Sequence, residues 1–148
     1  KRAIIEKGVL KGFCHTLSTA KACNQEPTGN ARRGVSSVPA PGLHNIVMAA
    51  GNIKRQSLID QAQGGLYIDQ LLGTFTSNFL AGQVSGNVSL GYALTGGERI
   101  GRVKNCALNV NTFELLKNHI VGISQEREWV GGQYLPWVLV DDVAISAR

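Results

Sequence analysis

Two runs of strand-forming residues separated by a pair of glycines constrain the fold of this chain more than any other feature. Residues 88–94 and 99–110 favour β-structure, and the four residues between them are Thr95-Gly96-Gly97-Glu98. Adjacent glycines are a strong signal for a tight turn because glycine adopts positive φ without steric cost. The segment predicts a long antiparallel hairpin, so the fold must include an antiparallel sheet.

The residues after this hairpin predict a capped helix. Asn111 provides an Asx cap, and Glu114 follows three residues later in the manner of a capping box. Phe113, Leu116 and Ile120 recur at helical spacing. We therefore expect a helix that runs to about Val121 and carries one apolar face.

Further elements follow from local patterns. We expect a hairpin over 2–15, a helix over 16–23 capped by Ser18 or Thr19, an extended segment over 44–49, a helix over 52–63, a strand over 66–71 and a last strand over 138–145 that bends at Asp141-Asp142. Residues 24–42 and 74–86 are predicted loops. Strands joined in sequence by tight turns favour an α+β fold, with an antiparallel sheet and two or three helices packed on it.

Length and composition limit the class of protein. With 148 residues and 43% hydrophobic content, the chain can enclose one core. No apolar run approaches the roughly 20 residues of a membrane span, so we predict no membrane insertion. Three cysteines without paired spacing predict free thiols and a cytoplasmic location. Because the chain begins at Lys1 within strand-like residues, we expect it to be the C-terminal portion of a longer protein.

The positive charge is concentrated in the first third of the chain. Residues 1–55 hold nine Lys or Arg against two acidic residues, whereas residues 56–148 hold six against eight. A basic patch could bind nucleic acid, but this one lacks interleaved aromatic residues and any recognisable nucleic-acid motif. We interpret it as solvated charge or as a face toward an absent half of the protein, and keep a nucleic-acid-binding module as the third functional alternative.

The loop over 24–42 carries the main candidate site. It is longer than a passive connection normally is. Gly29 and Asn30 can adopt positive φ and expose N–H groups, and arginines provide fixed donors for carboxylate or carbonyl oxygens. An equally open interpretation is an arginine-anchored loop at a subunit interface. The candidate substrate-binding or interface residues, with two that follow the loop, are Thr28, Gly29, Asn30, Arg32, Arg33, His44 and Asn45.

No catalytic or metal-binding residue is predicted in this chain. Nothing in the sequence pairs His15, His44 and His119 as ligands. Cys14 and His15 could suggest a nucleophile and base, but neighbours on a strand point to opposite faces. We therefore expect no catalytic residue, no metal ligand and no cofactor in the chain itself.

Six segments, in this order, resemble the TldD/PmbA family of peptidase-related proteins over nearly the whole chain. They are IIEKGVLKGFCHTLSTAKA, EPTGNARR, PGLHNIVM, GGLYIDQLLG, GRVKNCALNVNTFELLKN and LVDDVAIS. The resemblance implies that residues 1–148 are a single C-terminal α+β domain, with the N-terminal half absent, in a protein that assembles as a dimer. The TldD branch is similar to zinc metallopeptidases that act on flexible or unfolded peptides, with zinc held by an HExxxH helix and a cysteine near the C-terminus.

The chain departs from that zinc-binding pattern. It contains no HExxxH, and residues 126–135, where the resemblance implies the cysteine, read EREWVGGQYL. This departure points to the PmbA/TldE branch or to a divergent member with another third ligand. The first hypothesis is a peptidase component that helps to form a peptide-binding cleft, as a homodimer or with a TldD-like subunit, with zinc supplied from elsewhere. The alternative is a non-catalytic regulatory or scaffold subunit of a zinc peptidase heterodimer.

Overall fold

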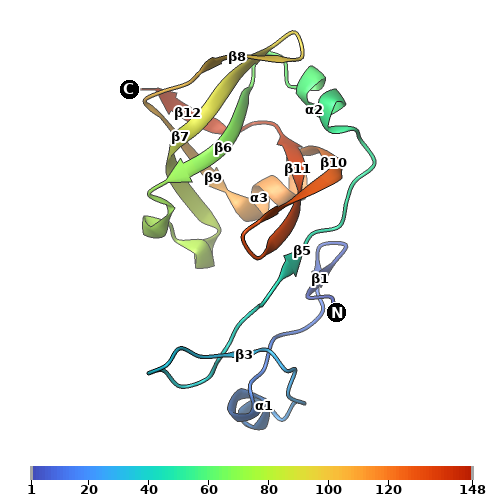
Figure 1. Ribbon diagram of the computed structural model, residues 1–148, viewed down its shortest axis with the longest axis vertical. Helices are drawn as coiled ribbons and strands as arrows, with labels where there is room; N and C mark the ends of the chain where they lie inside the picture. The colour runs from blue at the N-terminus through green and yellow to red at the C-terminus, as the bar shows by residue number, and fades with distance from the viewer. Residues whose placement is uncertain (1, 148) are drawn as a thin grey trace. The chain divides into compact units, whose positions relative to one another are not determined.

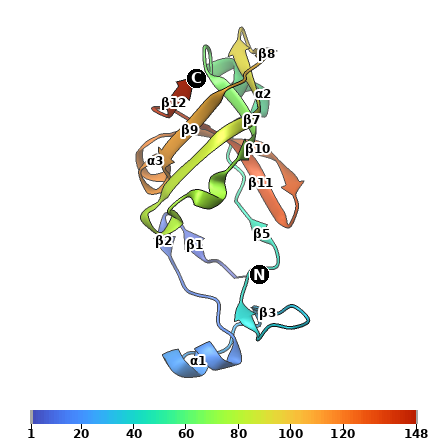
Figure 2. The ribbon, with the colours of Figure 1, turned by 90° about the vertical axis from the view of Figure 1, so that its left-hand side faces the viewer.

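The computed structural model describes residues 2–147, which form two compact units (Figures 1 and 2). Unit 1 consists of residues 2–47 and 129–134, and unit 2 consists of residues 48–128 and 135–147. The described residues include three α-helices, and most strand pairs are antiparallel, which confirms the α+β class. None of the helices within 2–147 has the length and apolar character needed to cross a membrane.

A five-stranded antiparallel sheet forms the centre of unit 2, in the order β12-β9-β7-β6, with β8 also paired to β7. Its strands are β6 (Leu66–Leu72), β7 (Gln83–Thr95), β8 (Glu98–Arg102), β9 (Cys106–Asn111) and β12 (Ala144–Ala147). The long strand β7 pairs with β9 through residues 83–87 and with β6 through residues 87–93 (Figure 2). Val88, Leu94 and Cys106 are buried in this sheet.

The predicted glycine turn is confirmed, but the strand after it is shorter than expected. Thr95 pairs with Glu98, and Gly96 and Gly97 have φ values of 59° and 79°, as a two-residue turn of type I′ requires. The prediction of one strand over 99–110 is wrong. Strand β8 ends at Arg102 and β9 begins at Cys106, because Asn105 adopts a left-handed conformation (φ 55°) that interrupts extended structure.

The predicted loop over 74–86 is partly regular. It contains two short 3₁₀ helices, η1 (Thr74–Thr76) and η2 (Phe79–Ala81), and β7 already begins at Gln83. Strand pairing with β9 extends β7 through these polar residues, so the tertiary partner outweighs their weak local preference for a strand.

Helix α3 (Thr112–Asn118) begins where the sequence predicts and ends earlier. The Asn111 side chain accepts hydrogen bonds from the main-chain N–H groups of Phe113 and Glu114. The helix stops before His119 because strand β10 begins at Ile120. Its apolar face is not buried: the exposed fractions of Phe113 and Leu116 are 61% and 57%.

A long hairpin formed by β10 (Ile120–Val130) and β11 (Gln133–Val140) was not predicted, apart from the last residues of β11. The fully buried Ser124 lies in it: its hydroxyl donates to the carbonyl of Glu126 and accepts from the main-chain N–H of Trp137. The predicted last strand over 138–145 is two strands, β11 and β12. Asp142 between them has φ 52°, as the expected bend requires.

Helix α2 (Arg55–Gln61) lies within the predicted range and packs on β10. A Cβ atom added at Gly122 would lie 2.7 Å from side-chain carbons of both Leu58 and Ile53. Glycine at this position therefore allows the buried Leu58 side chain to approach the strand closely.

Unit 1 contains two small hairpins and a short helix. Its elements are β1 (Ile5–Glu6), β2 (Val9–Leu10), α1 (Leu17–Cys23), β3 (Ala31–Arg32), β4 (Ala40–Pro41) and β5 (Ile46–Val47). The predicted loop over 24–42 thus includes the β3–β4 pair. The cap of α1 is Thr16, not Ser18 or Thr19, since Thr16 exchanges hydrogen bonds with the main chain and side chain of Thr19. Strand β5 pairs with β11 in parallel.

Gly51 provides a test of the packing between the chain before α2 and β10. The main chain of Ile123 lies so close that no side chain fits at Gly51, and Gly51 N–H bonds the carbonyl of Ser124. We expect Gly51→Ala to lower the free energy of unfolding by about 3 kcal/mol or more, because the backbone must move. Gly101→Ala is the matched control: nothing lies within 4 Å of its added Cβ, and we expect a change below about 1 kcal/mol in urea unfolding. Equal effects of the two substitutions would contradict this packing.

Candidate functional site

Thr28 of the predicted site is an anchor within unit 1. Its hydroxyl accepts a hydrogen bond from the main-chain N–H of His15 (2.8 Å) and donates to the carbonyl of the same residue (3.1 Å). Its own N–H also bonds the His15 carbonyl. These bonds join the start of the predicted loop to the segment before α1.

Arg32 is also engaged in holding the loop. Its Nη1 donates to the carbonyl of Leu43 at 3.0 Å, and its aliphatic stem lies against Gly42. The Gly42 N–H bonds the carbonyl of Asn30. Gly29 has the expected positive φ (72°), whereas Asn30 is not among the residues with positive φ. The β3–β4 hairpin is thus closed by main-chain and arginine hydrogen bonds.

The remaining candidate residues are exposed. Arg33, His44 and Asn45 all lie on the surface of unit 1. His44 and Asn45 lie next to the tip of the β10–β11 hairpin, because the carbonyl of Gly132 accepts from Ile46 N–H. A Cβ at Gly132 would lie 3.0 Å from the carbonyl oxygen of His44. The structure therefore brings the loop and the hairpin tip together.

Unit 1 also contains a cavity that the sequence did not predict. Its volume is about 580 Å³, and its lining includes Arg2, Lys11, Phe13, His15, Cys23 and Glu26. The Nδ1 atom of His15 is buried there without a hydrogen-bond partner. No periodicity or motif signals this cavity, because its lining comes from the segments that flank the β1–β2 hairpin and from residues next to both ends of α1.

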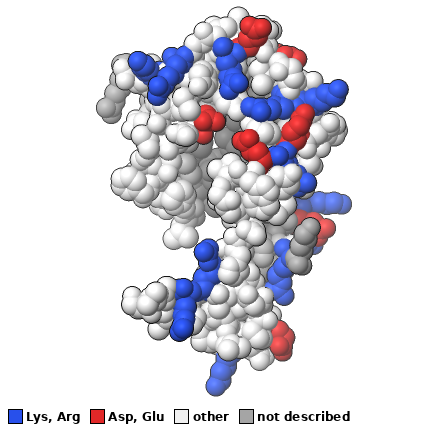
Figure 3. Space-filling model, viewed as in Figure 1, with Lys and Arg blue, Asp and Glu red and all other residues white. Residues whose placement is uncertain are grey.

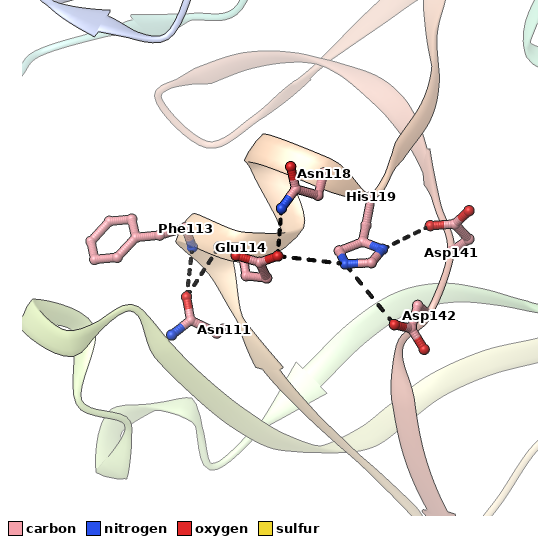
Figure 4. A network of polar contacts seen from close by, with 7 residues as sticks. All are labelled: Asn111, Phe113, Glu114, Asn118, His119, Asp141 and Asp142. Atoms are coloured by element: carbon pink, nitrogen blue, oxygen red, sulfur yellow. Dashed lines mark hydrogen bonds and ion pairs between the residues drawn. The ribbon is translucent and has the colours of Figure 1, made fainter.

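His119 is the centre of a polar network in unit 2 (Figure 4). It is the C-cap residue of α3, and its side chain is 26% exposed. Its Nδ1 lies 3.1 Å from Asp141 Oδ1, and its Nε2 lies 4.0 Å from both Glu114 Oε1 and Asp142 Oδ2. The network joins the end of α3 to the bend between β11 and β12.

The described side chains do not fit a zinc ion. Among residues 2–147 there is no group of three or more His, Cys, Asp or Glu side chains arranged to hold a metal. In the His119 network the imidazole contacts Asp141 directly, whereas zinc ligands surround the ion at about 2.0–2.3 Å from it. Cys14, Cys23 and Cys106 are unpaired and differ in burial, from exposed to buried.

The two outer strands of the unit 2 sheet differ in regularity. Strand β6 has one register shift between Ile68 and Gln70, at Asp69, and a second between Gln70 and Leu71. Such irregularity together with a charge discourages further pairing. Strand β12 pairs with β9 in regular register through all four residues, and it is the last strand in that direction of the sheet as described. Residues 144–147 are exposed and include no charge and no proline. The outer edge of β12 can therefore accept another strand.

On the face of unit 2 shown in Figure 3, charged side chains do not form one continuous basic band. On the visible face of unit 2, Asp and Glu side chains lie among the Lys and Arg side chains. This distribution differs from the single basic stripe that is typical of nucleic-acid-binding proteins.

The comparisons with known proteins agree on one family. Residues 1–147 match the family described as PmbA/TldA metallopeptidase C-terminal domain. A metalloprotease of Archaeoglobus fulgidus is 32% identical over 82% of this chain and 28% of its own length. A metalloprotease TldD homologue of Buchnera aphidicola from Schizaphis graminum is 27% identical over 77% of this chain and 24% of its own.

A solved structure shows the same fold. The crystal structure of TldE from Thermococcus kodakarensis superposes with a TM-score of 0.86 at 26% identity, over 97% of this chain and 33% of that protein. The chain thus spans about a quarter to a third of the length of the relatives it matches.

Proposed function

The chain belongs to the PmbA/TldD metallopeptidase family, and from that premise we propose that it is the C-terminal domain of a peptidase component that binds flexible peptides. In this proposal residues 1–148 are one domain of a longer protein. Zinc chemistry is supplied from elsewhere, by an upstream segment or by a TldD-like partner subunit in a homodimer or heterodimer. The free cysteines favour a reducing, cytoplasmic compartment.

The observation that carries this proposal is the outer edge of β12, which pairs with no other strand among residues 2–147. An unfolded peptide has free main-chain N–H and C=O groups, and an exposed regular strand offers the complementary row. Such pairing depends little on side chains, which suits a domain that handles flexible chains of varied sequence. The His119 network supports the edge, because it fixes the bend that leads into β12.

The loop residues have a second role in the proposal. Arg33, His44 and Asn45 are exposed, and Thr28 and Arg32 hold the loop that presents Arg33. We propose that this surface contacts either the peptide or the partner subunit. Arginine provides a fork of donors for carbonyl or carboxylate oxygens in both cases.

Main-chain pairing can be tested with modified peptides. We expect an extended, unfolded peptide to bind the protein, and the same peptide with every amide N-methylated to bind at least tenfold more weakly, because each methyl group removes a donor. Fluorescence anisotropy of the labelled peptide measures both. The control is methylated on alternate amides only, because such a peptide can still turn its unmethylated edge to the strand. Equal binding of all three peptides would contradict strand addition.

The alternative function is a non-catalytic regulatory or scaffold subunit of a zinc peptidase heterodimer. Two observations favour it: the fold superposes closely on TldE, and residues 126–135 contain no cysteine. A scaffold subunit would hold its partner in shape without binding peptide itself.

The zinc content of the purified protein distinguishes a peptidase component or scaffold subunit from a complete zinc peptidase. We expect the purified protein alone to contain far less than one equivalent of zinc, and its mixture with a TldD-like homologue to contain zinc in proportion to the homologue. The described side chains provide no ligand set, which is the reason for this expectation. About one equivalent of zinc in the protein alone, measured by mass spectrometry of the metal, would contradict the scaffold alternative. Under the first proposal it would mean that an upstream segment holds the zinc.

A further inference from the structure

Two arginines and three aromatic rings form a cluster in unit 2 that strand addition does not explain. Its members come from α2, β6, β7, β8 and β11, and they are Arg55, Tyr67, Tyr92, Arg99 and Trp137. Because these residues are as far apart as 82 positions in the sequence, only the fold reveals the cluster.

Arg55 is held rigidly by two of the rings. Its guanidinium carbon lies 4.0 Å from the centre of the Trp137 ring, and its Nη2 donates to the Tyr67 hydroxyl at 2.9 Å. The Trp137 indole N–H donates to the same hydroxyl at 3.0 Å. The Nε atom of Arg55 is buried without a hydrogen-bond partner. The Arg55 side chain is thus oriented, yet one of its buried donors is unsatisfied.

Arg99 lies at the same tyrosine. Its guanidinium carbon is 5.2 Å from the centre of the Tyr67 ring and 5.4 Å from that of Tyr92. Unlike Arg55, Arg99 is exposed. Two cationic groups, one half-buried and one at the surface, therefore adjoin one aromatic ring.

The segments that carry the two arginines are fixed to each other. Gln56, the residue after Arg55, donates from Nε2 to the carbonyl of Gly97 at 2.9 Å and to Asp60 Oδ1 at 3.1 Å. Gly97 is in the turn that precedes Arg99. This contact holds the N-terminal turn of α2 against the β7–β8 hairpin, so the two guanidinium groups are placed before any ligand arrives.

The positive charge of this cluster is not neutralised by the protein. None of the ion pairs found within residues 2–147 includes Arg55 or Arg99. The carboxylate of Glu126 accepts from the main-chain N–H of Arg55, not from its guanidinium. Aromatic faces attract cations but do not replace a hydrogen-bond acceptor. A guanidinium group without an acid partner is complementary to an anion that accepts from it, and this cluster has two such groups beside one ring.

We propose that Arg55 and Arg99 bind a carboxylate group of a flexible peptide. The site itself is inferred from the cluster; that the carboxylate belongs to a peptide rests on the proposed function. A planar carboxylate matches the planar fork of arginine and can accept from one or both guanidinium groups. Such a contact would fix one charged group of a peptide whose main chain is otherwise bound without sequence preference.

Trp137 provides a direct reporter of this site. Residues 1–148 contain two tryptophans, so Trp129→Phe leaves Trp137 as the only tryptophan in this part of the protein. In this background we expect N-acetylglycine to change the fluorescence of Trp137 saturably, whereas N-acetylglycinamide, which lacks the charge, should not. Arg99→Gln should raise the Kd for N-acetylglycine about tenfold, as loss of a charge-assisted contact predicts.

The control variant is Arg102→Gln. Arg102 is on the same strand as Arg99, and its substitution removes the same charge. It pairs with Tyr92 through the main chain, but its Nη2 donates to the carbonyl of Ser89, and the guanidinium groups found over the rings of the cluster are those of Arg55 and Arg99. We expect no change in Kd. Arg55→Lys, which keeps the charge and removes the fork, should also weaken binding, with folding checked by circular dichroism. Equal responses to acid and amide, or binding unaltered by both Arg99→Gln and Arg55→Lys, would overturn the site.

Two peptides identify the source of the carboxylate. One has a free C-terminus and no acidic residue; the other has an amidated C-terminus and one glutamate. The site is supported if either peptide binds more tightly than its uncharged counterpart and if this difference is lost in Arg99→Gln. The peptide that does so identifies the carboxylate that the site recognises. If the small acid binds and neither peptide does, the site stands and the proposed peptide function fails. If peptides bind without regard to their carboxylates, the site fails and the proposed function stands.

Discussion

The backbone hydrogen bonds of β7 organise the whole of unit 2. This strand pairs with β9 along its first residues, with β6 along its middle and with β8 along its last residues. Through β9 it also positions β12, the strand with the regular free edge. Through β6 and β8 it positions Tyr67 and Arg99, which belong to the arginine and aromatic cluster. Both proposed binding features therefore depend on one long strand and its register.

Local signals in the sequence were sufficient to predict the turns and helix caps whose conformation is determined by neighbouring residues. The Gly96-Gly97 turn requires two positive φ values, which only a few residue types tolerate, and the Asn111 cap requires a short polar acceptor. Both were predicted correctly. The bend at Asp141-Asp142 is a third case, since aspartate is among the few residues that adopt the left-handed conformation seen at Asp142.

Elements determined by distant contacts were predicted poorly. Strand β10 contains the polar run Gln125-Glu126-Arg127-Glu128, which does not show the hydrophobic pattern of a strand. Pairing with β11 stabilises the strand despite this polarity. The sequence predicted one apolar face for α3, but Phe113 and Leu116 are 61% and 57% exposed. The same reasoning applies to the site. Sequence could indicate Thr28 and Arg32 as special, but not that their side chains bond His15 and Leu43 within unit 1.

The most direct test of the account is hydrogen–deuterium exchange of β12 in the presence and absence of an unfolded peptide. An amide that faces outward from Ala144–Ala147 is bonded to no other strand in the structure, so it should exchange rapidly in the free protein. Strand addition predicts that such amides exchange at least tenfold more slowly when peptide is bound, while those that face β9 change little. Bound peptide with unchanged exchange throughout β12 would contradict the claim that this edge receives it.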